Sequence, residues 1–429
     1  MSERTSSPRE DDVDLDDINL LDADAFADGV PYEWFTYLRA NAPVFRHAEP
    51  DGPGFWVITR HADVRRVGHD FASFSSAAEL GGIDALVDGE PPTLTEGRML
   101  PLMDPPDHTR YRQLIQGSFR PPAIRSYEER FRASTVRVLD KAVESESVEF
   151  VDAVSSRLPS LAISTMLGLP ETDCQRIVDW STKLVESEVA DAEVRHAQGR
   201  AAYEEIRSYA RVLADVRRRR PSDDVLSTLA LARLDGVPLS EEDFASFLVL
   251  LLTAGDETTR NSLAHAVIAF AADPTQLDTV RRDPTCIPTA VEEVLRWATP
   301  ALYFRRTATR DSEIRGVPIR PGDKVSLWYI SANRDEEAIR EPHRFDVRRS
   351  PNDHLAFGHG PHFCLGVHLA RTEIRIFLEE LAMRVKAIEL DGEVVRLRSN
   401  AVHGIKRLPI RLIPNRNVQQ RRVAGRGRI

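Results

Sequence analysis

The segment Phe357-Gly358-His359-Gly360-Pro361-His362-Phe363-Cys364-Leu365-Gly366 decides the fold of this 429-residue chain. An amphipathic helix pattern runs from Leu365 to Arg384, so Cys364 stands at the positive end of a helix dipole, which stabilises a thiolate. The glycines allow unusual backbone angles and the close approach of a flat ligand. Taken alone, the segment fits either a thiolate that ligates a metal or a buried structural cysteine in a tight turn.

A second informative stretch is a long helix that begins after Ser240. Ser240 is a good N-cap, and the acids at 241–243 suit the positive end of a helix. The helical pattern continues to Ala272, before Pro274. Its middle, Phe247 to Ala254, is apolar on all sides, so we expect a central, buried helix.

The centre of that helix carries the polar run Ala254-Gly255-Asp256-Glu257-Thr258-Thr259. Acids and hydroxyls in an apolar helix centre are costly unless they have partners. Thr258 lies one turn after Ala254 and can bond back to its carbonyl, which bends the helix. By itself this run also fits a polar helix exit.

Together these segments resemble the cytochrome P-450 family. The cysteine segment matches the haem-binding signature F-G-x-G-x-H-x-C-x-G at all six fixed positions, and the helix centre is similar to the family's A-G-x-[DE]-T-T motif. The resemblance implies haem b, with Cys364 as axial thiolate on the iron, and O2 as co-substrate. It further implies that Thr258 hydrogen-bonds dioxygen and that Glu257 relays protons. The implied haem contacts are His108, Arg112, Arg306, His362, Phe357, Gly358, Gly366, Ala254 and Gly255.

Two of these implied roles depend on local spacing. His108 and Arg112 are four residues apart and share a helix face, as in the family's H-x-x-x-R propionate contact, although a solvated surface helix would look the same. Arg306 resembles the arginine that holds the other propionate, and the adjacent Arg305 is the alternative.

An E-x-x-R motif is expected to hold the core on the haem side. Glu293 and Arg296 can pair on one helix face, and Arg344 is similar to the third member of the family's ion triad. The E-x-x-R spacing recurs elsewhere in the chain, so only its position about 70 residues before Cys364 selects Glu293.

The fold class expected is mainly α with small β-sheets, arranged as a cytochrome P-450 fold. Short strands are expected at 44–46, 55–58, 302–329, 394–397 and 408–413, helices at 61–68, 113–220 and 287–297, and an irregular loop at 76–103. Residues 18–415 are predicted to be one domain, because motifs far apart in sequence must converge on one haem. Residues 1–17 and 416–429 are predicted to be disordered acidic and basic tails.

Composition narrows the remaining classes. The net charge of −10 argues against nucleic-acid binding. Three cysteines are too few for a disulfide scaffold, which favours a reducing cytoplasm; Cys174 and Cys286 match no family position. No apolar run approaches the roughly 20 residues of a membrane span.

The resemblance therefore implies a monooxygenase that hydroxylates a hydrophobic or partly hydrophobic small molecule, in secondary metabolism. An amino acid or acyl group tethered to a carrier protein in antibiotic biosynthesis is an alternative substrate, and a haem-thiolate sensor without turnover is an alternative function. Because the chain has no flavin or ferredoxin segment, a ferredoxin and its reductase should supply electrons to a monomer, through a basic patch that includes Arg112 and Arg371. The pocket is expected to include the loop 76–103, helices near 171–200, and Leu250, Ala254, Ala301, Leu302 and Val402.

Overall fold

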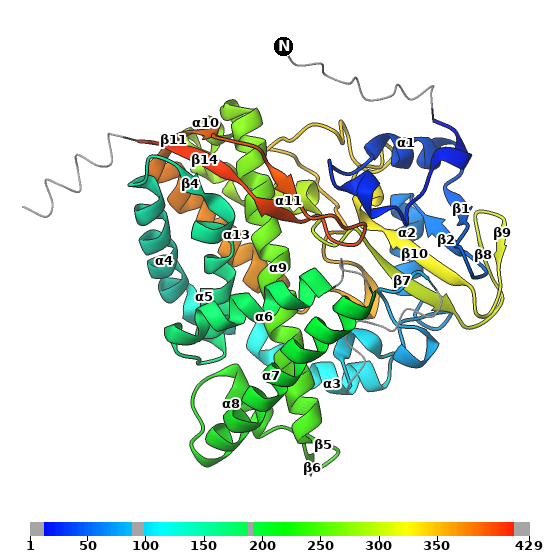
Figure 1. The fold of residues 1–429 in the computed structure, drawn as a ribbon, viewed down its shortest axis with the longest axis horizontal. Helices are drawn as coiled ribbons and strands as arrows, with labels where there is room; N and C mark the ends of the chain where they lie inside the picture. Colours follow the sequence, from blue (N-terminus) through cyan, green and yellow to red (C-terminus); the bar gives the residue numbers. More distant parts are fainter. Residues whose placement is uncertain (1–12, 88–97, 188–191, 416–429) are drawn as a thin grey trace, which may run out of the picture.

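The computed structural model describes residues 13–87, 98–187 and 192–415. Helices dominate these residues, and the strands lie in separate small sheets on different sides of the helical body (Figure 1). The α-helices are α1 (Tyr32–Asn41), α2 (His61–His69), α3 (Asp107–Ile115), α4 (Pro121–Val143), α5 (Arg157–Met166), α6 (Cys174–Ser187), α7 (Ala192–Arg219), α8 (Val225–Ala230), α9 (Glu241–Ala272), α10 (Pro274–Arg282), α11 (Ile287–Ala298), α12 (Tyr329–Ala332) and α13 (Val367–Arg384).

The largest sheet has five strands in the order β1-β2-β10-β7-β3, and only the β2–β10 pair is parallel. A three-stranded sheet, β11-β14-β4, packs near the end of α13, and three two-stranded ladders complete the described strands. The strands are β1 (Val44–His47), β2 (Phe55–Ile58), β3 (Phe74–Ser75), β4 (Val148–Glu149), β5 (Arg233–Leu234), β6 (Val237–Pro238), β7 (Tyr303–Ala308), β8 (Ser312–Ile314), β9 (Val317–Ile319), β10 (Lys324–Trp328), β11 (Val385–Leu390), β12 (Val395–Arg396), β13 (Ile405–Arg407) and β14 (Pro409–Pro414).

The helix α9 runs through the middle of the molecule (Figure 1). Its first half belongs to a hydrophobic cluster with α5–α8, and its second half to a cluster with α11, α13 and the β11–β14 sheet. As predicted, the side chain of Ser240 caps the helix by accepting from the backbone N–H of Asp243 at 3.0 Å. The central position follows from the sequence, because a helix that is apolar all round must bury every face.

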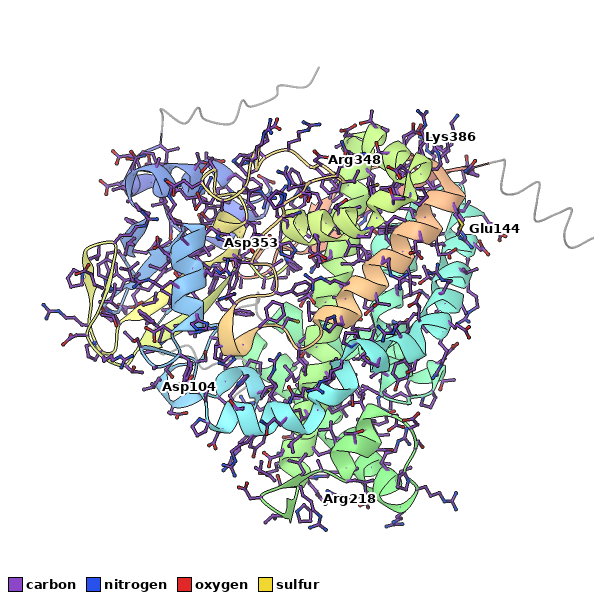
Figure 2. The ribbon with its side chains drawn as sticks, turned by 180° about the vertical axis from the view of Figure 1, so that it is seen from behind. Asp104, Glu144, Arg218, Arg348, Asp353 and Lys386 are labelled. Atoms are coloured by element: carbon purple, nitrogen blue, oxygen red, sulfur yellow. The ribbon has the colours of Figure 1, made fainter. Side chains whose placement is uncertain are left out.

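The helix α13 packs beside α9, and the cysteine segment leads into it. Seen from the opposite side, α13 crosses in front of α9 and the segment around Asp353 approaches it across the surface (Figure 2). The helix begins at Val367, two residues later than the sequence predicts, because Leu365 and Gly366 complete the turn that follows Cys364.

Several elements differ from the sequence prediction. The helix α1 and the strand β11 are not predicted. In the described part of the stretch 113–220, which is predicted to be helical, the strand β4 separates α4 from α5. Residues 13–17 are not a free tail: Leu15–Asp17 forms a 3-10 turn, and Val13 and Leu15 pack against the N-terminal hydrophobic cluster. Residues 1–12, 88–97 and 416–429 lie outside the described residues, so the rest of both tail predictions and the centre of the loop 76–103 stay predictions.

Candidate functional site

Cys364 lies in a tight loop that its own backbone closes. The N–H of Cys364 donates to the carbonyl of Phe357 at 3.0 Å, and the N–H of Phe363 donates to that of Gly360 at 3.0 Å. Gly358 and Gly360 have φ values of +69° and +81°, which side chains rarely tolerate. The loop therefore holds the sulfur at a fixed point two residues before the N-cap of α13.

Gly360 also allows the loop to contact α2 directly. A Cβ atom at this position would lie 2.3 Å from the carbonyl oxygen of Gly68 and 2.8 Å from the Cα of His69. Both atoms are backbone and cannot move aside cheaply. The requirement for glycine at 360 is therefore twofold, in backbone angle and in space.

The electrostatics around the Cys364 thiol work in opposite directions. Burial raises its pKa, while a backbone N–H of Gly366 and the charges of Arg112 and Arg371 lower it. A coordinated metal cation removes the cost of burial, because a coordinating thiol loses its proton. This chemistry fits a metal ligand better than an inert core cysteine.

Four basic side chains form a cluster on the loop side of α3 and β7. The rings of His108 and His362 are 4.3 Å apart, Arg112 reaches the carbonyl of Pro361 at 3.4 Å, and Arg306 is 4% exposed. Burial and the surrounding positive charges lower the pKa of His362 to about 2 and that of His108 to about 4. Arg306 forms no ion pair within the described part of the chain. The charge of Asp104 acts on both Arg306 and His108, and it is the one carboxylate among the causes of their pKa shifts.

Two nitrogen atoms in this cluster are buried without a partner in the structure, Nδ1 of His108 and Nε2 of His362. Unsatisfied buried donors are costly, and propionate carboxylates are the ligands that guanidinium and imidazole N–H groups suit best. The residues present therefore fit the two propionates of haem b. We find the expected residue types brought together from α3, β7 and the cysteine loop.

Arg305 and Arg306 are adjacent in sequence but have different surroundings. The guanidinium of Arg305 donates to the carbonyls of Ala85 at 2.6 Å and Leu80 at 3.1 Å, away from the histidines. Arg306 instead contributes to the lowered pKa of His362. Arg306 is thus the arginine that belongs to the cluster.

One strip in the middle of α9 is open, although most residues of this helix are buried. Ala254 and Thr258 are exposed, and Leu250 is half-buried, at the i, i+4 and i+8 positions of one face. The Thr258 hydroxyl donates to the Ala254 carbonyl at 2.9 Å, as the sequence predicts. An apolar strip that ends in a hydroxyl suits a ligand that is apolar along most of its length.

Glu257 lies beside this strip, with its side chain turned into the protein. It is 8% exposed and pairs with Arg260 at 3.0 Å. Burial raises its pKa to about 7, against the opposing charge of Arg260. A carboxyl group with this pKa can both give and take a proton near neutral pH.

The expected substrate segments meet at one point. Ala301 and Val402 form an isolated β-bridge, and both are half-buried. Leu302 does not share this surface: it is 1% exposed and packs in the N-terminal cluster with Phe35 and Trp328. The pocket prediction is therefore wrong for Leu302, because its side chain points to the opposite side from that of Ala301. Residues 88–97 and 188–191 of the other predicted pocket segments lie outside the described residues.

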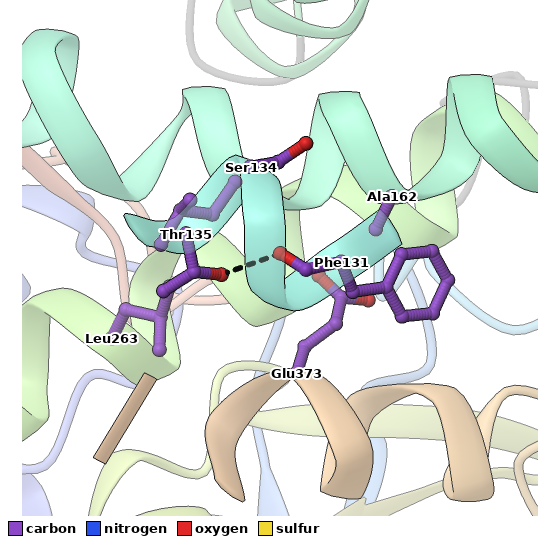
Figure 3. Close-up of a pocket in the computed structure, with 7 residues that line it drawn as sticks. Phe131, Ser134, Thr135, Ala162, Leu263 and Glu373 are labelled. Atoms are coloured by element: carbon purple, nitrogen blue, oxygen red, sulfur yellow. Dashed lines mark hydrogen bonds between the residues drawn. The ribbon is translucent and has the colours of Figure 1, made fainter. Parts of the chain in front are cut away.

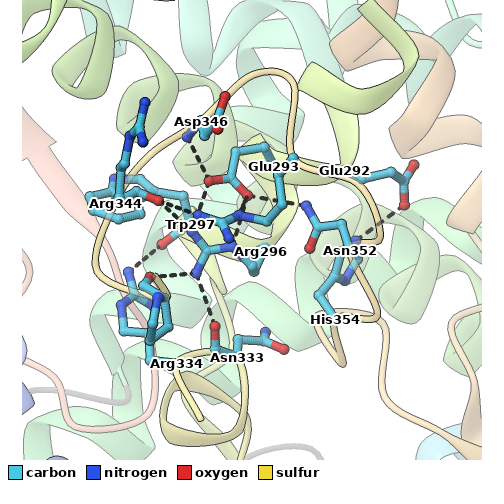
Figure 4. Close-up of polar contacts among 12 residues, drawn as sticks. Glu292, Glu293, Arg296, Trp297, Asn333, Arg334, Arg344, Asp346, Asn352 and His354 are labelled. Carbon is cyan, nitrogen blue, oxygen red and sulfur yellow. Dashed lines mark hydrogen bonds and ion pairs between the residues drawn. The ribbon is translucent and has the colours of Figure 1, made fainter. Parts of the chain in front are cut away.

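The E-x-x-R pair forms as predicted, but its third member differs (Figure 4). Glu293 and Arg296 pair through two bonds of 2.8 Å. The guanidinium that joins them is that of Arg349, whose Nε donates to Glu293 at 2.9 Å. Arg344 contributes only its backbone carbonyl, and its side chain is 58% exposed beside Glu341. The prediction for Arg344 is wrong, because its side chain points to the surface while Arg349 points inward.

The predicted basic docking patch is weaker than expected. Arg371 donates two bonds to Glu292, at 2.8 and 2.7 Å, which neutralises its charge. Arg112 is half-buried and turned toward the loop carbonyl of Pro361.

Sequence reasoning missed a buried acid behind the cysteine loop. Glu373 on α13 points into a small cavity with Ser134 and Thr135 of α4 (Figure 3). The cavity has room for about one water molecule. The amphipathic pattern of residues 365–384 does not indicate that Glu373 is buried, because a glutamate in such a helix is expected to face solvent.

Cys286 lies apart from this site. Cys286 is buried at the start of α11, where burial raises the pKa of its thiol. Cys174 begins α6.

The fold and the basic cluster around a buried thiol define a haem-thiolate class of protein. The family model described as Cytochrome P-450 matches residues 285–393. Linalool 8-monooxygenase of Pseudomonas putida is 36% identical over 404 residues, covering 92% of this chain and 99% of that protein. Methyl-branched lipid omega-hydroxylase of Mycobacterium tuberculosis is 37% identical over 414 residues, covering 93% of this chain and 95% of its own length.

Solved structures agree with the sequence relatives. A Mycobacterium marinum cytochrome P-450 in complex with pseudoionone aligns with a TM-score of 0.85 and 35% identity, over 95% of this chain and 100% of that one. The chain belongs to the cytochrome P-450 family of haem monooxygenases. Within the part of the chain that the structure describes, no helix is long and apolar enough to cross a membrane.

Proposed function

We propose that Cys364 ligates the iron of haem b and that His108, Arg112, Arg306 and His362 hold its propionates. The observation that carries this assignment is the convergence of a half-buried thiol with four basic groups, two of which have buried nitrogen atoms without a partner among the described residues. Phe357, Gly358, Gly366, Ala254 and Gly255 would contact the ring. The packed body from Val13 to Asn415 would act as one catalytic domain.

The bound haem supplies the oxygen-activating chemistry of the family. The Thr258 hydroxyl donates its hydrogen bond to the Ala254 carbonyl, so its oxygen remains able to accept a hydrogen bond. Glu257 supplies protons, and its pKa near 7 suits that task. To do so its carboxyl must turn from Arg260 toward the open strip of α9. The reaction proposed is hydroxylation of a C–H bond.

We infer that the substrate is a free hydrophobic small molecule. Leu250, Ala254, Ala301 and Val402 offer apolar surface, and Thr258 adds an exposed hydroxyl. Relatives are described as acting on linalool, on steroids and on methyl-branched lipids. A ferredoxin and its reductase would supply the electrons to a monomer in the cytoplasm, in secondary metabolism. A carrier-bound substrate is the second outcome that the binding test can reveal.

The first test is spectroscopic. The reduced carbon-monoxide complex should absorb at the wavelength that gives the family its name, and the Cys364→Ala variant should lose that band. A colourless purified protein, or a variant that keeps the band, would overturn the thiolate assignment.

The second test addresses the reaction. High-spin spectral shifts are measured with linalool, a steroid, a branched fatty acid and a carrier-bound amino acid, and turnover follows with a surrogate ferredoxin and its reductase. Hydroxylated product establishes the enzyme, whereas binding without turnover under reducing conditions would favour a sensor.

A further inference from the structure

Two segments that are far apart in sequence are joined beside the open strip of α9. The first, residues 298–302, follows α11, and the second, residues 399–405, is the turn between β12 and β13. The N–H of Leu302 donates to the Ala401 carbonyl at 2.8 Å, and the N–H of His403 donates to that of Pro300 at 2.8 Å. These bonds flank the bridge between Ala301 and Val402.

The side chain of His403 adds a further hydrogen bond between the two segments. It is 9% exposed, and its Nδ1 donates to the carbonyl of Ala298 at 2.6 Å. The first segment is therefore held to the second by one side-chain bond in addition to the backbone bonds.

A second histidine fastens the same junction to α9. The ring of His265, which is 6% exposed, lies 3.8 Å from the ring of His403, and its Nε2 donates to the His403 carbonyl at 3.1 Å. One turn earlier on α9, the side-chain oxygen of Asn261 accepts from the N–H of Ile405 at 3.1 Å. The turn 399–405 is thus tied to the helix whose open strip contains Thr258.

Both rings are suited to this arrangement as neutral groups. Burial lowers the pKa of His265 to about 4, and burial together with His265 lowers the pKa of His403 further below its ordinary value. Each ring faces a carbonyl oxygen with one nitrogen, so that nitrogen carries the proton. Neutral rings can stack closely, which two cations could not.

We propose that His265 and His403 are positioning residues that set the place of Ala301 and Val402 relative to α9, and thereby the orientation of the substrate. This inference rests on the proposed function, which assigns Ala301 and Val402 to the pocket. The pair itself touches neither haem nor substrate, and it acts through the two segments that it joins.

Hydrogen exchange measured by mass spectrometry tests, without any ligand, whether His403 joins residues 298–302 to residues 399–405; this connection is called the joint below. In the His403→Phe variant, the ring remains and the Nδ1–H donor is lost, so exchange should rise about fivefold in both 298–302 and 399–405, the scale of one lost buried hydrogen bond. The His403→Asn variant keeps a donor and should restore slow exchange in 298–302. A rise confined to 399–405 would overturn the joint.

The pocket is tested with 4-phenylimidazole, which binds haem iron and fills the space above it. Its affinity should fall about fivefold in His403→Phe and in His265→Phe, and recover in His403→Asn. The matched control is His47→Phe, which removes another buried histidine, one that accepts from the N–H of Leu20 at 2.9 Å in the N-terminal cluster. That variant should change affinity less than twofold.

The outcomes separate the two ideas. Unchanged azole affinity in His403→Phe, with exchange raised in both segments, would reject the positioning role while keeping the joint. If the wild type showed neither the carbon-monoxide band nor azole binding, the proposed function would fail, and hydrogen exchange would still decide whether the histidines join the segments. If His403→Phe does not fold, His403→Leu, which also removes the Nδ1–H donor, is compared with His403→Asn in both measurements.

Discussion

Two glutamates on the neighbouring helices α11 and α13 are both buried, yet their surroundings are opposite. Glu293 is 0% exposed and accepts five hydrogen bonds, two of them from Arg296 and one each from Arg349, Asn352 and the N–H of Asp346 (Figure 4). Glu373 is 7% exposed, and neither of its carboxyl oxygens has a partner in the structure (Figure 3). Burial raises its pKa well above the ordinary value, and the charge of Asp256 adds to that effect.

The difference shows that burial alone does not decide what a carboxyl group does. Glu293 is surrounded by donors and guanidinium groups, which favour the carboxylate and make it a structural anchor. Glu373 has lost its water and gained no donor, so the neutral acid is favoured and the site stores a proton. Four predictions can break or sharpen this contrast.

The largest effect is expected from Glu293→Gln. The five N–H groups of Arg296 are all used, two on Glu293 and three on backbone carbonyls. Removing the carboxylate leaves this arginine and Arg349 as uncompensated buried charges, which costs about 3–5 kcal/mol. Urea unfolding followed by circular dichroism measures this loss. A loss below about 1 kcal/mol would mean that the network does not anchor the core.

The next effect distinguishes the two arginines after the motif. Arg349→Met should lower the free energy of unfolding by about 1.5–3 kcal/mol, because it removes a charged hydrogen bond to Glu293. Arg344→Met should change it by less than about 0.5 kcal/mol, since the Arg344 side chain is at the surface. The same unfolding assay on both variants decides the matter, and a larger effect from Arg344 would restore the sequence prediction.

The comparison of Arg344 with Arg349 also shows which features can be predicted from the sequence and which cannot. The cysteine loop, the long helix and the Glu293–Arg296 pair are local patterns, and backbone geometry or helical spacing specifies them within a few residues. Arg349 could not be chosen over Arg344, because the direction of a side chain in an irregular segment depends on contacts from other elements.

The same limit applies to acids and short elements. Glu373 looks like a solvated helix position, since its burial arises only when α4 and α5 cover α13. The strand β11 follows α13 with no glycine or proline between them, so the helix pattern conceals it. The pocket prediction for Leu302 failed because successive side chains of an extended segment point to opposite faces. Leu302 follows Ala301 directly and therefore faces away from it.

The third prediction compares two glutamates of α13, whose replacement by glutamine should change stability at neutral pH in opposite directions. The folded-state pKa of Glu373 lies above its ordinary value of 4.5, so its stabilising contribution is present below pH 4.5 and is lost as pH rises toward the folded value. Relative to Glu373→Gln, the wild type should lose up to about 1.4 kcal/mol per pH unit in that window. The variant should be the more stable protein at neutral pH.

The matched control for that prediction is Glu380→Gln. Glu380 is 3% exposed but pairs with Arg132 at 2.7 Å and with Arg384. Its loss should destabilise the protein at neutral pH, because two guanidinium groups lose their partner. Unfolding free energies from pH 5 to 8 measure both variants. If Glu373→Gln were also destabilising at neutral pH, Glu373 would be ionised in the folded protein, and its contrast with Glu293 would disappear.

The smallest effect is expected from Thr135→Val, which asks whether burial or a nearby hydroxyl holds the proton on Glu373. The Thr135 hydroxyl already donates to the carbonyl of Phe131 at 3.0 Å (Figure 3), so it can only accept from a protonated Glu373 across the cavity. Its removal should therefore cost less than about 1 kcal/mol and should leave the pH dependence of unfolding unchanged. Burial is the main cause of the raised pKa, and valine leaves Glu373 equally buried. A pH dependence that vanished in Thr135→Val would instead show that the Thr135 hydroxyl stabilises the protonated form of Glu373. Glu373 and Glu293 would then differ in the kind of hydrogen-bond partner, and not in whether they have one.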